Sequence, residues 1–434
     1  MNIIYVTDPA SEAAQLRKAT IIQDSLLDYA KAIMRDVAEH GDPAVLNYTS
    51  KFDGVRLDSL RVSEQEMNQA YAQVTKDEIM AVKLMKQRLV KCELAILKRL
   101  KGMVVSSSDG VRIDRMVKPV TSVGCYIPGG RARYPSTVVM CAVPAKIASV
   151  KRIVALSPPR RDGTIDPLTL VAADICRVDE FYKIGGAQGI AALTYGTQSI
   201  RPVSKIVGPG GMFVTAAKLV ASAKVSIDMV AGPTELLIYA DASADPHLIA
   251  VDLISQAEHS TDTICGLVTT SDKLASEVQK RVGSIVRKIT RSDIVKKSLE
   301  NNGFIVICRN ESSCIEFVNE FAPEHLELMC KYADAIARKI DSAGLVLIGQ
   351  YAPSSASDYS LGSNHVLPTL GFGKSRASLS VLDFVKIVNK VKVNKPGLAK
   401  VDRSIKEITS AEGLLNHYEA VKVRINEKKE QLAQ

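Results

Sequence analysis

Four of the six histidines lie in short polar segments that also carry carboxylate or amide side chains. The segments are "VDLISQAEH" with Gln256 and His259, "FAPEHLEL" with Glu324 and His325, "SDYSLGSNHVLP" with Asp358 and His365, and "EGLLNH" with Glu412 and His417. Imidazole nitrogens and carboxylate oxygens bind zinc and carry protons in catalysis. Each segment alone also fits a structural histidine. Three of them fall at expected ends of strands or helices, where sites form in open sheets.

The first segment could supply half of a metal site. Its apolar run leads into Gln256 and His259, whose spacing of three residues puts both side chains on one helix face. Together with Asp358 and His417 they form a plausible set of zinc ligands, although an amide oxygen is unusual in that role. The eight cysteines form no Cys-x-x-Cys pair. This argues against a cysteine zinc site or a disulfide framework and favours a reducing cytoplasm.

The adjacent residues Glu324 and His325 could transfer protons. Neighbours on a strand face opposite sides, but the proline before them favours a bend, in which both side chains could reach one cavity. A histidine there can accept and return a proton near neutral pH. A surface glutamate beside a helix-capping histidine is the alternative, and the residues alone leave it open.

Two glycine-rich turns could bind a phosphate. "GGAQG" (185–189) and "GPGG" (208–211) each follow an expected strand and open an expected helix. Such turns can present backbone N–H groups to an anion at a helix N-terminus. Neither matches the dinucleotide pattern G-x-G-x-x-G, and ordinary tight turns between a strand and a helix remain the alternative.

The elements that must position these residues fall into three regimes. Up to about residue 119 the pattern is mainly helical. A helix begins at Asp24 or Ser25 and stops at Gly41, and the capping box of Thr75 and Glu78 opens a second helix. A hairpin, "MVVSSSDGVRIDRMV", follows and turns at its Asp-Gly pair.

From about 120 to 350, short β-branched runs alternate with helical runs. The expected strands are "RIVALS", "YKIGG", "KIVG", "ELLIYA", "GLVTT", "GFIVIC" and "GLVLIG". This alternation predicts an α/β fold with two parallel-sheet units, resembling incomplete Rossmann units, with helices on both sheet faces. The segment "DMVAGPTE" marks the crossing between the units. After about 377 the chain is helical and basic, with too little apolar mass for a core of its own.

Composition narrows the class of protein. The 434 residues are 46% hydrophobic and 24% charged, as in soluble multidomain proteins. No apolar stretch approaches the ~20 residues of a membrane span, and the start lacks the pattern of a signal peptide. The formal net charge is +9, but Lys and Arg are interspersed with acids, Trp is absent and aromatics make up 5%. We therefore expect a solvated basic surface and no nucleic-acid or membrane partner.

Several blocks resemble the histidinol dehydrogenase family. They are "GDPAVLNYTSKFDGV", "VGCYIPGGRARYPSTVVM", "IGGAQGIAAL", "KIVGPGG", "AGPTELLIYAD", "DLISQAEH", "FAPEHLEL", "SDYSLGSNHVLPT" and "AEGLLNH". They occur in order with similar spacing over nearly the whole chain. The resemblance implies a cytoplasmic, zinc-dependent and NAD-linked enzyme. It would oxidise L-histidinol to L-histidinaldehyde and then to L-histidine, the last steps of histidine biosynthesis, consuming two NAD.

The resemblance also implies a role for particular residues. The catalytic pair is Glu324 and His325; the ligands of one zinc per subunit are Gln256, His259, Asp358 and His417; the substrate contacts are Thr234, Gln256, His259, His325, Asp358, Glu412 and His417; and the nucleotide contacts are Tyr126, Gln188 and Gly211. Two positions depart from the family pattern. Gly211 stands where Asn is common, so a side-chain hydrogen bond to the cofactor would be missing. Thr234 stands where Ser is common, and keeps the hydroxyl.

The family architecture implies an intertwined homodimer in which the C-terminal segment completes the partner's active site. We accordingly expect an N-terminal helical arm (1–24), a catalytic and metal-binding α/β domain (25–124 and 232–377), a nucleotide-binding α/β domain (125–231) and a helical tail (378–434). Glu412 and His417 lie about 140° apart on a straight helix, so a bend or a large cavity must separate them.

Two alternative functions are a related zinc and NAD dehydrogenase for another small polar alcohol, and a non-catalytic binding or assembly protein.

Overall fold

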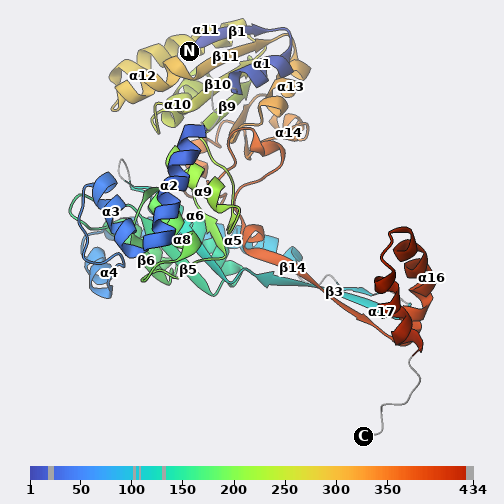
Figure 1. Ribbon diagram of the computed structural model, residues 1–434. Coiled ribbons are helices and arrows are strands. Elements are labelled where there is room, and N and C mark those ends of the chain that lie inside the picture. Colours follow the sequence, from blue (N-terminus) through green and yellow to red (C-terminus); the bar gives the residue numbers. More distant parts are fainter. Residues whose placement is uncertain (18–23, 101–103, 107–108, 130–132, 427–434) are drawn as a thin grey trace. The chain divides into compact units, whose positions relative to one another are not determined.

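The computed structural model describes residues 1–17, 24–100, 104–106, 109–129 and 133–426 (Figure 1). The chain forms two compact units. The larger comprises Met1–Leu94 and Val120–Phe384, and the smaller comprises Ala95–Pro119 and Val385–Gln434. Among the described residues, none of the helices combines the length and apolar character needed to cross a membrane.

The larger unit holds a parallel six-stranded sheet. Its order is β1 (Asn2–Val6), β11 (Gly303–Cys308), β10 (Ile264–Thr269), β9 (Glu235–Ala240), β12 (His325–Met329) and β13 (Leu345–Ile348). The central strands are apolar almost throughout, because helices cover both sheet faces. One face packs on α10 (Pro246–Ala257), α11 (Asp272–Ile285) and α12 (Ser292–Asn301); the other packs on α1 (Pro9–Arg17), α13 (Glu311–Phe321) and α14 (Ala333–Ala337) (Figure 1).

A second parallel sheet lies in the same unit. Its order is β6 (Glu180–Lys183), β5 (Arg152–Ser157), β4 (Ser122–Tyr126), β7 (Lys205–Val207) and β8 (Ser226–Ile227). One face packs on α2 (Asp24–His40), α3 (Asp42–Asp53), α8 (Gly186–Tyr195) and α9 (Met212–Ala221), while α6 (Pro135–Ile147) contacts β4 and β5 and packs on α7 (Pro167–Ile175). The chain runs from β4 to one edge and returns to β7. The strand order therefore reverses between β4 and β7.

The remaining elements of the larger unit connect these layers. They are α4 (Glu64–Tyr71), which contacts α7, α5 (Lys76–Leu100), whose last residues pass into the smaller unit, α15 (Ser354–Ser357), and the 3-10 turns η2 (Val286–Lys288), η3 (Phe372–Lys374) and η4 (Val381–Phe384).

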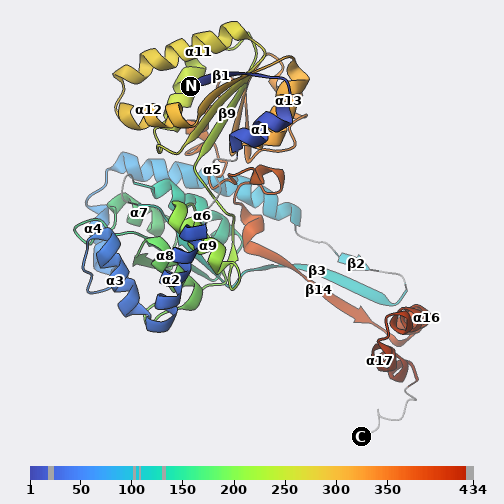
Figure 2. The same cartoon turned by 45° about the horizontal axis from the view of Figure 1, so that its top comes forward.

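The smaller unit is an antiparallel ribbon followed by two helices. The ribbon has the order β14 (Val385–Val393), β3 (Val111–Pro119) and β2 (Val104–Ser106). Helices α16 (Lys395–Ala411) and α17 (Leu415–Asn426) follow, and Figure 2 shows them beside one another. Gly413, with φ +73°, makes the turn between them. A left-handed turn of this kind favours glycine, which has no Cβ to clash.

The α/β class with two parallel sheets is confirmed. Each of the seven expected runs overlaps a strand. The capping box is also present: the Thr75 Oγ1 accepts from the Glu78 N–H at 3.1 Å, and the Thr75 N–H donates to the Glu78 carboxylate at 2.8 Å. Helix α2 ends before Gly41, which has φ +64°. The start of α2 adjoins residues outside the described ranges.

Three parts of the expected domain division are wrong. Residues 1–24 are not a helical arm throughout, because the apolar run 2–6 pairs with β11 as an edge strand. In the range 25–124, α2 and α3 pack on the five-stranded sheet, and the boundary at 124 falls inside β4. The range 378–434 is not helical throughout, since β14 precedes its helices. An amphipathic stripe predicts a buried helix face but not the sheet that covers it.

The buried sheet gives a direct test of stability. Leu267 on β10 is fully buried, whereas Leu84 on α5 is 45% exposed. Leu267→Ala should lower the free energy of unfolding by about 2–5 kcal/mol, because it removes transfer energy and leaves a cavity. The matched control Leu84→Ala should change it by less than about 0.5 kcal/mol. Urea denaturation followed by circular dichroism measures both, and equal effects would contradict the assigned core.

Candidate active site

The polar residues of the first and second segments meet at the amino ends of neighbouring strands. Thr234 immediately precedes β9, and Glu324 immediately precedes β12, which pairs with β9. Gln256 lies in the last turn of α10, and the His259 N–H donates to the Gln256 carbonyl at 3.2 Å. Gln256 and His259 therefore both lie at the C-terminal end of α10, with His259 just beyond the helix. Asp358 follows α15 directly.

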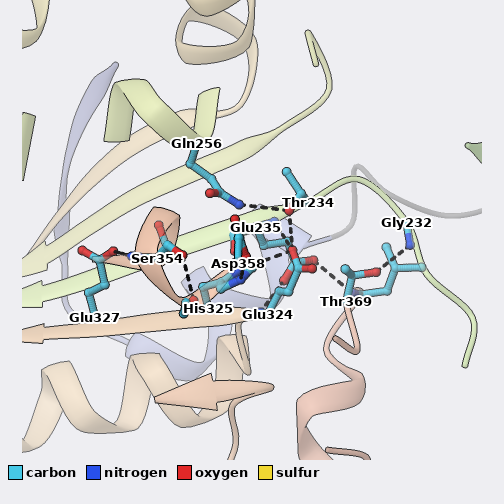
Figure 3. A network of polar contacts seen from close by, with 12 residues as sticks. Gly232, Thr234, Glu235, Gln256, Glu324, His325, Glu327, Ser354, Asp358 and Thr369 are labelled. Atoms are coloured by element: carbon cyan, nitrogen blue, oxygen red, sulfur yellow. Dashed lines mark hydrogen bonds and ion pairs between the residues drawn. The ribbon is translucent and has the colours of Figure 1, made fainter. Parts of the chain in front are cut away.

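Thr234 and Glu235 hold the carboxylate of Glu324 directly, and Gln256 supports it through Thr234 (Figure 3). Its Oε2 accepts hydrogen bonds from the Thr234 hydroxyl at 2.6 Å and from the Glu235 N–H at 2.7 Å. The Thr234 hydroxyl in turn accepts from Nε2 of Gln256 at 3.0 Å. The amide nitrogen of Gln256 is thus hydrogen-bonded to Thr234. The amide oxygen is then the atom of this side chain that can coordinate a metal ion.

His325 lies between two carboxylates. Its Nδ1 is 3.2 Å from the Glu235 carbonyl oxygen, which can only accept, so Nδ1 carries a proton and donates. Its Nε2 is buried without a hydrogen-bond partner, 3.5 Å from Oδ1 of Asp358. Burial lowers the pKa of His325, but Glu324 and Asp358 outweigh it and raise this pKa well above the ordinary value. The site therefore stabilises an imidazolium at His325.

Asp358 is surrounded by imidazoles. Burial raises its pKa, but His325, His365 and His259 together hold the pKa below its usual value. His365 is placed by two contacts of its ring: Nδ1 is 2.7 Å from the Asp358 carbonyl oxygen, and Nε2 is 3.3 Å from the Thr137 hydroxyl. Burial lowers the pKa of His365. A carboxylate beside imidazole nitrogens provides donor atoms of the kind that zinc binds.

Glu235 is a residue of this site that the sequence did not reveal. Its side chain is fully buried and accepts two hydrogen bonds from the Arg17 guanidinium, at 2.5 and 3.1 Å. It also accepts from the Leu370 N–H at 2.9 Å and from the Glu324 N–H at 3.2 Å. The sequence carries one sign of this role, because an acid stands at the start of the apolar run "ELLIYA". A carboxylate that is buried with such a strand needs an opposite charge or hydrogen-bond donors beside it.

The structure brings together only part of the expected metal set. Gln256, His259 and Asp358 lie in the larger unit, whereas His417 lies in the smaller one. Within the described portion of a single chain, no three His, Cys, Asp or Glu side chains form a cluster able to hold a metal ion.

The expected bend between Glu412 and His417 is present. Glu412 caps α16, and His417 lies in the first turn of α17. The left-handed Gly413 separates them, and the side chains of both Glu412 and His417 are exposed. Glu412 and His417 therefore do not lie on one straight helix, and they do not share a helix face.

A cavity of about 980 Å³ opens at the glycine turns of the second sheet. Its lining comes from α2, α3, α8 and α9, together with Pro233, Asp262 and Asn302. Gln188, on the first turn of α8, is among the lining residues, and Gly211 immediately precedes the lining residue Met212. Tyr126 lies behind the lining, where its hydroxyl accepts from the Gly186 N–H at 3.1 Å. A Cβ added at Gly211 would meet nothing within 4 Å, so this position has room for a side chain.

Comparisons with known proteins agree over nearly the full chain. The family model described as histidinol dehydrogenase matches residues 16–425. The histidinol dehydrogenase of Methanocaldococcus jannaschii is 40% identical over 402 residues, covering 93% of each chain. That of Bacillus cereus is 41% identical over 432 residues, covering 99% of this chain and 100% of its own.

A solved structure gives the same result for the fold. The crystal structure of histidinol dehydrogenase from Elizabethkingia anophelis aligns with a TM-score of 0.91 and 35% identity, covering 98% of both chains. The sequence comparisons and the structural comparison identify the same family. The chain belongs to the histidinol dehydrogenase family, whose members are NAD-dependent dehydrogenases of histidine biosynthesis.

Proposed function

We propose that this chain oxidises L-histidinol to L-histidine through L-histidinaldehyde, using two NAD and one zinc ion per subunit in a homodimer. Family membership supports the reaction. The single structural observation that carries the proposal is the network in which Thr234, Glu324, His325 and Asp358 meet beside Gln256. A buried acid and a buried base in one place can serve two successive oxidations. The free thiols among the described cysteines fit a reducing cytoplasm.

The residues fit a zinc ion. The imidazole of His259 and the carboxylate of Asp358 supply common zinc donors, and the oxygen of Gln256 adds a third. Asp358 is held ionised by the imidazoles around it. The site also follows the C-terminal end of α10, whose carbonyl groups favour a cation. His417 would be the fourth ligand. Bound zinc would supply a Lewis acid for the nitrogen atoms of the substrate, and NAD would supply the hydride acceptor.

His325 has the geometry of the base for the alcohol step. Its Nδ1–H is committed to the Glu235 carbonyl, which leaves Nε2 to accept the hydroxyl proton of the substrate as hydride leaves the carbinol carbon. The imidazolium that forms is stabilised by the carboxylates of Glu324 and Asp358, which lie 3.6 Å from Nδ1 and 3.5 Å from Nε2. The residue acts as a general base from its neutral form, in which Nδ1 carries the proton and Nε2 has no hydrogen-bond partner.

Glu324 has the geometry of the base for the aldehyde step. It takes a proton from water as the oxygen attacks the aldehyde carbon, and the second hydride then leaves that carbon to give the carboxylate. The hydroxyl of Thr234 and the N–H of Glu235 fix one carboxylate oxygen at 2.6 and 2.7 Å, which orients the group. Substrate contacts from Gln256, His259 and Asp358 would come from the same chain.

The cavity at the second sheet is the proposed nucleotide site. It lies at the carboxyl ends of parallel strands, on the side where α8 and α9 begin. Ligands of α/β sheets bind at such ends, where the strand order reverses, and helix N-termini there favour phosphate groups. We assign Gln188 and the backbone at Gly211 as nucleotide contacts, with Tyr126 supporting the turn at Gly186.

We propose that the smaller unit packs on the partner subunit and contributes residues to its active site. Helix α17 buries no described side chain, and apolar side chains of the ribbon and helices are exposed. These exposed residues are Ile387, Val388, Val391, Val393, Val401, Ile408, Leu414, Leu415 and Val423. A second copy of the chain would cover them and would receive Glu412 and His417 at its active site.

Loss of one ligand should remove the metal without unfolding the chain. In His259→Ala, zinc content should fall below about a tenth of the wild-type value per subunit, with activity falling in parallel, because an imidazole donor of a tetrahedral site is lost. The matched control is His247→Ala, an exposed histidine in the first turn of α10, the helix that His259 follows. It should retain full zinc. Atomic absorption on the purified proteins decides, and a full complement of zinc in His259→Ala would remove this residue from the ligand set.

The two oxidation steps should separate at Glu324. In a single turnover, Glu324→Gln should keep most of the rate of L-histidinol oxidation but lose about 100-fold or more in L-histidinaldehyde oxidation, because only the second step needs a base for water. His325→Ala should slow both steps. Glu320→Gln, at an exposed acid on α13 paired with Lys374, serves as the control and should change neither rate. Equal losses in both steps for Glu324→Gln would contradict the assignment.

Complementation tests the shared active site. His259→Ala and His417→Ala proteins, each inactive, are unfolded together and refolded as a mixture. About half of the dimers should be mixed, and each mixed dimer should hold one site with both lesions and one with neither. Activity should therefore recover toward a quarter of the wild-type value, while either variant refolded alone stays inactive. Mixed dimers that form without any activity would show that His417 acts within its own chain.

A further inference from the structure

A buried ion pair lies outside the proposed catalytic site and has no part in its chemistry. Nζ of Lys218, on α9, is 2.5 Å from Oδ1 of Asp228, which directly follows β8. Their side chains are 2% and 0% exposed. Removing two charges from water is costly, and such a pair is tolerated when further hydrogen bonds satisfy its remaining groups.

Two of those further hydrogen bonds are made with the backbone groups of one glycine, Gly208. Lys218 Nζ donates to the Gly208 carbonyl at 2.9 Å, and Asp228 Oδ2 accepts from the Gly208 N–H at 2.7 Å. The other oxygen of Asp228 accepts from the Met229 N–H at 2.6 Å. One ion pair therefore holds both the donor and the acceptor of Gly208.

Gly208 occupies the point where the strand order of the five-stranded sheet reverses. It follows β7 and opens the turn "GPGG" that leads into α9. Its φ is +112°, and a Cβ there would lie 2.2 Å from the carbonyl oxygen of Tyr126, the last residue of β4. The turn thus passes directly over the end of β4, and Tyr126 in turn contacts the N–H of Gly186 at the start of α8.

We propose that Lys218 and Asp228 are positioning residues for the nucleotide. Their ion pair fixes the backbone of Gly208. It thereby holds the "GPGG" turn against the end of β4, in the conformation that binds NAD. This inference rests on the proposed nucleotide site. A turn that contacts its ligand through backbone atoms gains affinity from being fixed before the ligand arrives.

Lys218→Met tests the proposal because it keeps the aliphatic stem and removes Nζ. Titration of the full-length, zinc-loaded protein with NAD, followed by calorimetry, should give a Kd at least tenfold above that of the wild type. Zinc content and the Kd for L-histidinol without NAD should stay within twofold of the wild-type values, since neither depends on the turn.

Arg152→Met is the matched control. Arg152 pairs with Glu180 at 2.7 Å, with side chains 13% and 12% exposed, on β5 and β6 of the same sheet. Its loss should lower the thermal midpoint and leave the Kd for NAD within twofold. If Arg152→Met weakens NAD binding as much as Lys218→Met at an equal loss of thermal stability, the Lys218 pair is only structural and the proposal is wrong.

A second variant covers the case in which Lys218→Met fails to fold. Asp228→Asn keeps the shape of the side chain and one acceptor oxygen while removing the charge that orients Lys218. It should also raise the Kd for NAD, by at least threefold. An unchanged Kd in a folded Lys218→Met or Asp228→Asn protein overturns the positioning role. A wild-type protein that does not bind NAD would instead overturn the proposed nucleotide site, and the two failures are thereby distinguished.

Discussion

The buried carboxylate of Glu235 is the constraint on which the proposed catalytic residues depend. A fully buried carboxylate without a counter-charge would be strongly unfavourable, and the guanidinium of Arg17 lies against it at 2.5 Å. Burial raises the pKa of Glu235, and Arg17 opposes that shift. The backbone of the same residue holds the carboxylate of Glu324 through its N–H and the ring of His325 through its carbonyl. Helix α1, β9 and β12 are therefore joined at one residue.

The proposed metal and nucleotide sites lie at opposite ends of the strands of the two parallel sheets, and this difference agrees with the charge of each ligand. The proposed metal residues lie at the amino ends of β9 and β12 and beyond the C-terminus of α10. A cation gains there from helix carbonyls. The proposed nucleotide residues lie at the carboxyl ends of the other sheet, where α8 and α9 begin. Phosphate groups gain there from helix N–H groups.

The sequence predicted those features that depend on local pattern. Continuous apolar runs identified β9, β10 and β11, and the apolar run before Gln256 and His259 indicated the helix end at which both residues lie. Features that depend on distant partners were missed. The run 2–6 becomes a strand only because β11 lies beside it, and Glu235 reads as an ordinary acid until Arg17, 218 residues away, is placed against it. The helices α2 and α3 were assigned to the wrong sheet for the same reason.

In the proposed dimer, the contacts that stabilise the smaller unit would also place its residues at the active site. In α16 only Gly397 and Thr409 are buried among the described residues, and α17 buries none. A pair of helices with so little buried surface is too small to form a core alone. Strand β14 nevertheless keeps nine residues in register with β3, so the ribbon is ordered while its apolar side chains Ile387 and Val391 stay exposed. An ordered apolar surface of this kind supports the contact with a second chain proposed for this unit. Placing Glu412 and His417 on such a surface would make the active site conditional on dimer formation, because the contacts that stabilise the helices would also deliver their side chains.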